Sequence, residues 1–169
     1  MNGRLEIVGI AIALGIGATM VMDVWMLIRK RAFGIAALDY ALVGRWFATL
    51  ARGKFRHKSI AGSPSVPGER VVGLLAHHAS GIVFAGLLLA IWGIDWIRQP
   101  TLAPALIVGI GSVAAPFLLM QPGMGIAARL TPRPAFARLN SLVTHAVFGV
   151  GLYMAGWTMK AMGVWLQDF

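Results

Sequence analysis

Four long apolar segments dominate this chain of 169 residues. A helix needs about 20 predominantly apolar residues to cross the hydrocarbon core of a bilayer. Only helices and closed barrels satisfy every backbone polar group there. The sequence therefore predicts an all-α integral membrane protein, one membrane domain whose four transmembrane helices form a compact bundle. The predicted spans cover about residues 5–28, 71–97, 101–124 and 139–164.

The composition agrees with a membrane protein and excludes several classes of site. Charged residues make up 12% of the chain, about half of what a soluble domain carries. Cysteine is absent, which excludes disulfides, thiolate metal sites and iron–sulfur clusters. The formal net charge is +9, but the basic residues flank the apolar spans. We therefore expect lipid headgroups, and not nucleic acid, as their partners.

The distribution of basic residues predicts an orientation. Residues 29–70 contain nine Lys and Arg, and residues 129–138 contain three more. The opposite side of the predicted membrane carries only Arg4, Arg98 and Lys160. Because positively charged loops stay in the cytoplasm, both termini are expected on the non-cytoplasmic side.

The first basic loop contains a predicted amphipathic helix over residues 36–52. Its apolar residues recur at helical spacing, which is typical of a helix lying in the membrane interface at the cytoplasmic face. Trp46 and Phe47 would anchor it in lipid, and the basic residues around and after it would contact anionic lipid. A solvated connector is the alternative. The apolar stripe consists of Leu38, Leu42, Trp46, Phe47 and Leu50.

Ionisable residues are few inside the predicted spans. Asp23 lies in the first, His77 and His78 in the second and His145 in the fourth, and His78 is expected to point away from the others. Counted from the nearest basic anchors, Asp23, His77 and His145 lie roughly 9–12 Å inside the same membrane face. Charged groups in a bilayer are costly and mark function or specific packing. Their common depth predicts one buried polar cluster.

The spacing of the residues around Asp23, His77 and His145 indicates that these three side chains converge in the bundle interior. Asp23 follows Gly15 and Thr19 at intervals of four, and Gly73, His77 and Gly81 are spaced in the same way. Ser141, His145 and Gly149 form a third such series. Residues four apart share a helix face, and small residues let membrane helices approach closely. The three series are therefore expected to face the bundle interior.

Three kinds of chemistry suit the cluster. Asp23, His77 and His145 are ligands for a transition metal, to which Met20 or Met120 could be added for copper. His77 and His145 could instead hold a b-type haem between helices. The same groups could carry a proton, and the remaining alternative is hydrogen bonding that only fixes helix packing. Secondary candidates near the cluster are Gln121, His57 and Glu69.

Several strings resemble an uncharacterised bacterial membrane family, number twenty-nine thirty-eight among the domains of unknown function. The resemblance covers nearly the whole chain, and MQPGMG is its most specific part. It implies a bacterial inner-membrane protein and supplies no activity, cofactor or catalytic residue. The strings are GIGATMVMDVW (15–25), ALVGRWF (41–47), FRHKSIAGSPSVPGER (55–70), PFLLMQPGMGIAA (116–128) and SLVTHAVFGVGLY (141–153).

The leading hypothesis for function is a small membrane protein whose Asp23–His77–His145 cluster binds a metal or haem or passes protons. The competing hypothesis is a structural or accessory subunit of a larger membrane complex. A third is a small exporter that works as a dimer.

Overall fold

The computed structural model describes residues 2–35, 38–126 and 134–163, and every regular element in these ranges is helical. Two short elements have other helix geometries, the 3-10 helix η1 (Ile94–Ile97) and the π-helix η2 (Ala115–Met120). The α-helices are α1 (Asn2–Phe33), α2 (Tyr40–Leu50), α3 (Glu69–Trp92), α4 (Leu102–Gly111), α5 (Gln121–Met124) and α6 (Pro134–Ala161).

Four helical segments are long and apolar enough to cross a membrane, in agreement with the sequence prediction. Their exposed surface carries large apolar side chains, among them Val24, Leu75 and Val83. In a soluble protein so much exposed apolar surface would be unusual, whereas lipid tails would cover it in a bilayer. The segments are Leu5–Phe33, Glu69–Trp92, Leu102–Met124 and Ala135–Ala161.

The bounds of all four spans differ from the sequence prediction. The first continues beyond residue 28 to Phe33, and α6 covers Pro134–Ala161 where residues 139–164 were expected. The second was expected to continue to residue 97, but α3 ends at Trp92. Gly93 adopts a φ of 78°, which glycine tolerates and which ends the helix. The third was expected to be one continuous helix. It is interrupted after Gly111 because Pro116 has no amide hydrogen to donate, and the chain passes through η2 before α5.

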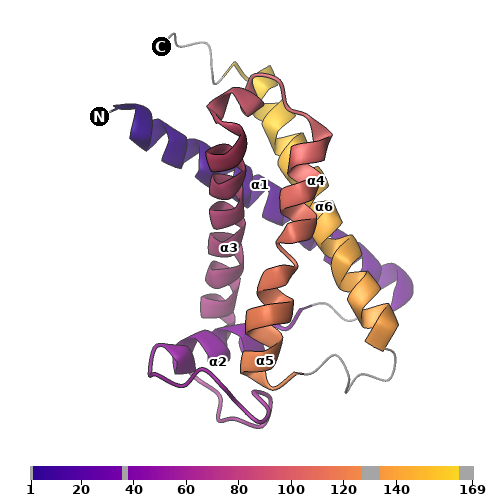
Figure 1. Ribbon diagram of the computed structural model, residues 1–169. Helices are drawn as coiled ribbons and strands as arrows, with labels where there is room; N and C mark the ends of the chain where they lie inside the picture. The colour runs from indigo at the N-terminus through magenta and orange to yellow at the C-terminus, as the bar shows by residue number, and fades with distance from the viewer. Residues whose placement is uncertain (1, 36–37, 127–133, 164–169) are drawn as a thin grey trace.

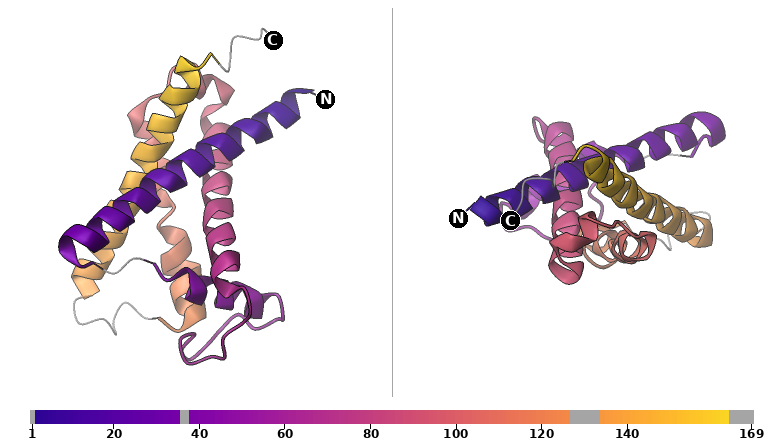
Figure 2. Two further views of the ribbon diagram at one scale, coloured as in Figure 1. Left: turned by 180° about the vertical axis from the view of Figure 1, so that it is seen from behind. Right: turned by 90° about the horizontal axis from the view of Figure 1, so that it is seen from above.

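The helices are not parallel. α1 runs obliquely across the molecule and packs against both α3 and α6, while α4 packs along α6 (Figures 1 and 2). The start of α1 and the end of α6 lie at one end of the molecule. The helices α2 and α5 lie at the opposite end, below the spans in Figure 1.

Helix crossings occur at small residues, as the spacing of glycines predicts. A Cβ at Gly44 of α2 would collide with the carbonyl oxygen of Glu69, and one at Gly73 of α3 would collide with that of Tyr40. The two helices therefore touch through their backbones. A Cβ at Gly109 of α4 would likewise collide with the backbone of Gly149 in α6. Such contacts allow membrane helices to pack closely by van der Waals attraction.

The position of Trp46 in α2 differs from the sequence prediction. Trp46 was predicted to anchor this helix in lipid, but it is 5% exposed and packs with Ile60 and Met124. Its Nε1 donates to the carbonyl oxygen of Phe55 at 2.9 Å. Trp46 is inside the protein because α2 docks on α3 and the following loop folds back over it. The indole therefore anchors the loop and not the membrane.

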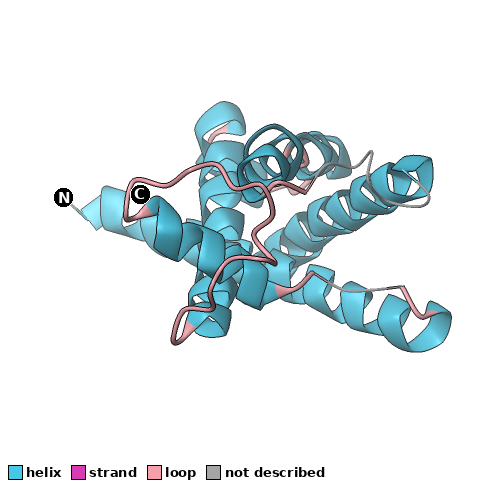
Figure 3. Cartoon of the chain, turned by 90° about the horizontal axis from the view of Figure 1, so that it is seen from below, coloured by secondary structure: helices cyan, strands magenta, loops and turns pink. Residues whose placement is uncertain are grey.

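The loop of residues 51–68 crosses the end of the molecule, as seen in Figure 3. The amide of His57 donates to the carbonyl oxygen of Gly123, and the amide of Ile60 donates to that of Met124, both at 2.9 Å. These bonds connect the loop to α5, so the loop and the third span form one unit at this end.

Candidate functional site

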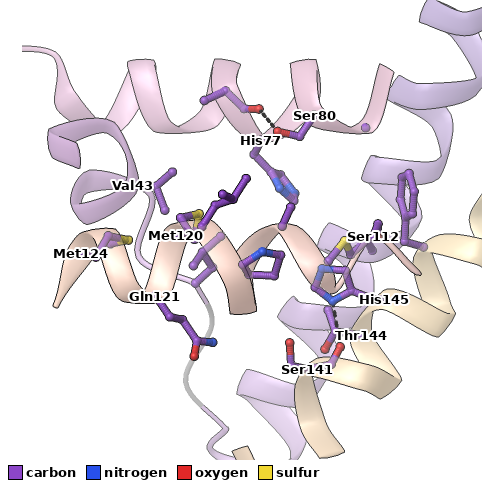
Figure 4. A pocket seen from close by; sticks show the side chains of 18 of the residues that line it. Val43, His77, Ser80, Ser112, Met120, Gln121, Met124, Ser141, Thr144 and His145 are labelled. Atoms are coloured by element: carbon purple, nitrogen blue, oxygen red, sulfur yellow. Dashed lines mark hydrogen bonds between the residues drawn. The ribbon is translucent and has the colours of Figure 1, made fainter. Parts of the chain in front are cut away.

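A cavity of about 670 Å³ lies between the spans in the half of the molecule that is nearer to α2 (Figure 4). All four spans and α2 contribute to its wall. Most of the wall is apolar, from side chains such as Met22, Phe84 and Phe148. Small-molecule sites have this size and composition, with a few polar groups that orient the ligand.

Asp23 and His77 meet across the α1–α3 crossing, as predicted. His77 Nε2 lies 3.1 Å from Asp23 Oδ1, and the hydroxyl of Tyr40 donates to the same carboxylate oxygen at 2.6 Å. The Asp23 side chain is 28% exposed and that of His77 is 12% exposed. The three residues come from two spans and the start of α2, and they form one hydrogen-bonded group.

His145 lies on the opposite side of the cavity from His77 and does not join the Asp23 group. Its Nδ1 donates to the Ser141 carbonyl oxygen at 2.9 Å, one turn earlier in α6. That bond leaves Nε2 of the neutral ring as an acceptor. Figure 4 shows the His77 and His145 side chains pointing into the cavity from α3 and α6.

The other predicted residues fall into two groups. Met120 and Gln121 line the cavity. His57 and Glu69 belong to the loop instead. The His57 ring contacts Thr49 Oγ1 at 3.0 Å and Ser63 Oγ at 3.2 Å, and Glu69 pairs with Arg45.

The predicted metal site is not supported by the arrangement of donors. Among the residues that the structure describes, no three His, Asp or Glu side chains are placed to hold a metal ion together. The haem hypothesis meets a related difficulty, because Nε2 of His77 already contacts Asp23. Ligation through that atom would break the bond. The described donor set therefore forms hydrogen bonds and does not support metal ligation.

Arg29 is a residue of this site that the sequence interpretation missed. It was predicted to be a membrane-surface anchor together with Lys30 and Arg31, which are indeed exposed. Arg29 itself is only 5% exposed and lines the cavity, and its Nη1 donates to Asn140 Oδ1 of α6. A signal was present, because Arg29 follows Met22 and Met26 on one helix face.

Tyr40 was also missed, and no sequence pattern marks it. It lies directly after Asp39, whose side chain accepts a hydrogen bond from the Ala41 amide at 2.9 Å and begins α2. Burial and the neighbouring Asp23 carboxylate raise the pKa of the Tyr40 hydroxyl above its ordinary value. Tyr40 therefore stays protonated and acts as a hydrogen-bond donor to Asp23.

The interrupted third span contributes the middle of the cavity wall. Ser112, Pro116 and Met120 line it from the segment between α4 and α5. The Ser112 hydroxyl donates to the Gly109 carbonyl oxygen at 2.6 Å. Irregular backbone at membrane depth is tolerated where it lines a cavity or is buried in protein. π-Helical segments are frequent at functional sites.

Comparison with known proteins identifies the family but no relative of known activity. No curated protein and no solved structure matches the chain. The sequence model of one family, described as a protein of unknown function (DUF2938), matches residues 12–159. This confirms the resemblance seen in the sequence strings, and the chain belongs to the DUF2938 family.

Proposed function

We propose that this protein binds a small molecule in the cavity between its spans and couples that binding to protonation of the Asp23–His77 pair. One observation carries the proposal. His77 lines the cavity and also contacts the Asp23 carboxylate at 3.1 Å. A proton gained or lost by the pair therefore changes the charge at the cavity wall.

The groups around His77 define this coupling. Asp23 from α1 and the Tyr40 hydroxyl contact each other, and the ring centroids of Tyr40 and His77 are 5.2 Å apart. His78 follows in α3, with its ring centroid 5.7 Å away. His145 and Arg29 lie on other parts of the cavity wall. Asp23 is the only carboxylate in this set, so protonation of the pair leaves a more positive wall.

The interrupted third span supports ligand binding. Membrane transporters place substrate sites where a spanning helix is discontinuous. Here the segment between α4 and α5 lines the cavity near its middle. Apolar faces of the spans remain available for lipid, a second copy of the chain or a larger complex.

We also propose the orientation that the basic residues predict. The end with α2 and the loop of residues 51–68 would face the cytoplasm, and both termini would lie outside, in the inner membrane of a bacterium. The supporting observation is that the first residues of α1 and the last of α6 lie at the same end of the molecule, opposite to α2. The cavity would then open in the cytoplasmic half of the bilayer.

The test uses two dyes with related aromatic ring systems. 1-Anilinonaphthalene-8-sulfonate is anionic at neutral and mildly acidic pH, and N-phenyl-1-naphthylamine is uncharged. Binding of both to the purified protein is followed by fluorescence between pH 5.5 and pH 8. Ala137→Phe, which fills the cavity wall, should weaken both dyes. In the wild type the anionic dye should bind several-fold more tightly as the pH falls, because protonation adds positive charge.

Asp23→Asn keeps the shape of the side chain and removes its charge, so the change of affinity with pH should shrink. Asp95→Asn is the matched control, because the Asp95 side chain in η1 is 76% exposed and pairs with Arg98, just after η1. An unaltered pH response in Asp23→Asn with normal thermal stability would assign the pair to helix packing. Undiminished dye binding in Ala137→Phe would refute ligand binding in the cavity.

A further inference from the structure

We propose that the ligand of the cavity is an anionic amphiphile, a molecule with one carboxylate or phosphate group and an apolar chain, whose anionic group binds Arg29. The inference rests on the proposed function, since it names the ligand class of the same cavity. It is carried by a different residue from those that carry the proton coupling, Arg29 near the end of α1.

Arg29 is buried, and within residues 2–35, 38–126 and 134–163 it has no negative partner. The side chain is 5% exposed, and no atom of the described residues forms a hydrogen bond with its Nε. Its Nη1 donates to Asn140, a neutral side chain. The ion pairs found in the described ranges join Arg45 to Glu69, His77 to Asp23 and Arg98 to Asp95, and none includes Arg29. A buried charge without a partner is costly, so the site is incomplete without an anion.

Arginine is suited to this role. Its planar guanidinium binds carboxylate and phosphate through two parallel hydrogen bonds. Asn140 fixes the group from α6 through Nη1, and the Trp25 ring lies 5.7 Å from the guanidinium carbon. Both neighbours orient the guanidinium without neutralising it. An incoming anion would therefore meet a guanidinium whose orientation is already fixed.

The rest of the cavity matches an apolar chain. No carboxylate lines the cavity within the described parts of the chain, whereas Arg29, His77 and His145 all do. Beyond these groups the wall is largely apolar, with Met26, Leu119 and Phe148 among its side chains. A volume of about 670 Å³ lies within the range of small-molecule sites. The anionic group of such a ligand would bind the basic part of the wall, and its apolar chain would pack against the rest.

Native mass spectrometry of the protein released from detergent tests the inference directly. The probes are oleate and phosphatidylglycerol, which are anionic, with methyl oleate and phosphatidylcholine as the neutral counterparts. At least one anionic probe should bind at least about tenfold more tightly than its counterpart, because a hydrogen bond to a charged group contributes that much. Preference for oleate would indicate a free single-chain acid, and preference for phosphatidylglycerol would indicate a membrane lipid. Either preference supports the inference.

Three variants locate the anion. Arg29→Gln should abolish the preference for the anionic probe, whereas Arg31→Gln should keep it because Arg31 is exposed. Asn140→Asp supplies an internal carboxylate beside Arg29, so it should abolish the preference even if Arg29→Gln fails to fold. Equal binding of anionic and neutral probes by the wild type would overturn the inference, as would an undiminished preference in Arg29→Gln or Asn140→Asp. Weaker binding of the uncharged naphthylamine dye in Ala137→Phe would then still support the proposed function.

Discussion

Arg45 and Glu69 form a two-point ion pair that joins α2 to the first residue of α3. Arg45 Nε donates to Oε2 at 2.8 Å, and Nη2 donates to Oε1 at 2.7 Å. The remaining Nη1 donates to the carbonyl oxygens of Ile60 and Ser63. Hydrogen bonding to Glu69 raises the pKa of Arg45 above its ordinary value. One side chain thus fixes both the helix pair and the loop between its members.

Replacing Arg45 by Lys should destabilise this end of the protein. A lysine ammonium cannot make the two parallel bonds to Glu69 and also reach the loop carbonyls. We expect the midpoint of thermal unfolding in detergent to fall by several degrees. Arg52→Lys, an exposed position just after α2, should leave it unchanged. An equal midpoint in Arg45→Lys and the wild type would show that the pair does not hold the loop.

Gly73→Ala should separate α2 from α3. The added methyl group would collide with the carbonyl oxygen of Tyr40, which is backbone and cannot turn away. Overpacking of this kind costs about 1–3 kcal/mol. Gly86→Ala in the same helix is the control, because a Cβ there has nothing within 4 Å. A stability loss as large for Gly86→Ala as for Gly73→Ala would contradict the crossing described above.

Tyr40 should ionise late in an alkaline titration. The pKa of Tyr40 is raised in the folded protein. The stability contributed by its protonated hydroxyl is therefore complete below the ordinary tyrosine pKa of about 10, and it is lost as the pH rises through the higher pKa of the folded state. Absorbance near 295 nm should therefore show one of the two tyrosines titrating late. Asp23→Asn should shift that ionisation to lower pH, because it removes the neighbouring negative charge. A titration curve unaffected by Asp23→Asn would exclude the bond to Tyr40.

Reporter fusions test the orientation. Alkaline phosphatase is active only outside the cytoplasm, so a fusion to the C-terminus should be active and one inserted after Gly62 should be inactive. Green fluorescent protein, which does not fluoresce after export in unfolded form, should give the opposite result. Activity at Gly62 together with inactivity at the C-terminus would reverse the proposed orientation.

The exposed basic residues after α2 are predicted to prefer anionic lipid. Arg52, Lys54, Arg56 and Lys58 are all exposed, and each could contribute about 1 kcal/mol near an anionic surface. Changing the last three to Gln should lower the share of phosphatidylglycerol that copurifies with the protein. The double variant Arg98→Gln/Lys160→Gln, at the other end of the molecule, should leave that share unchanged. Equal phosphatidylglycerol shares in both variants would show that this basic segment does not contact anionic lipid.

The sequence predicted the membrane class and the presence of four spans because the length of an apolar run is a local property. It also predicted the meeting of Asp23 with His77, since both depth and helix face can be counted from residues four apart. The break in the third span was missed, although Pro116 marked it. A single proline is often tolerated in a membrane helix, so the residue alone does not predict an interruption.

The face that Arg29 shares with Met22 and Met26 marks it as a candidate, but this local pattern does not fix its role. Whether a basic residue at the end of a span faces headgroups or the interior depends on the tilt of its helix. That tilt is set by packing against distant segments, here α3 and α6. The same holds for Trp46, which the amphipathic pattern assigned to lipid. An interior wall and a lipid surface favour the same apolar residues, so hydrophobicity alone does not separate them.

The contact between α1 and α6 has a consequence for the order of assembly during synthesis. Arg29 and Asn140 are 111 positions apart, whereas Arg45 and Glu69 are 24 apart. The α2–α3 pair can therefore form as soon as the second span leaves the ribosome. The cavity must wait for the fourth, because α6 completes its wall. Until then the nascent chain holds an open cleft, which its membrane-insertion machinery or neighbouring lipid must cover.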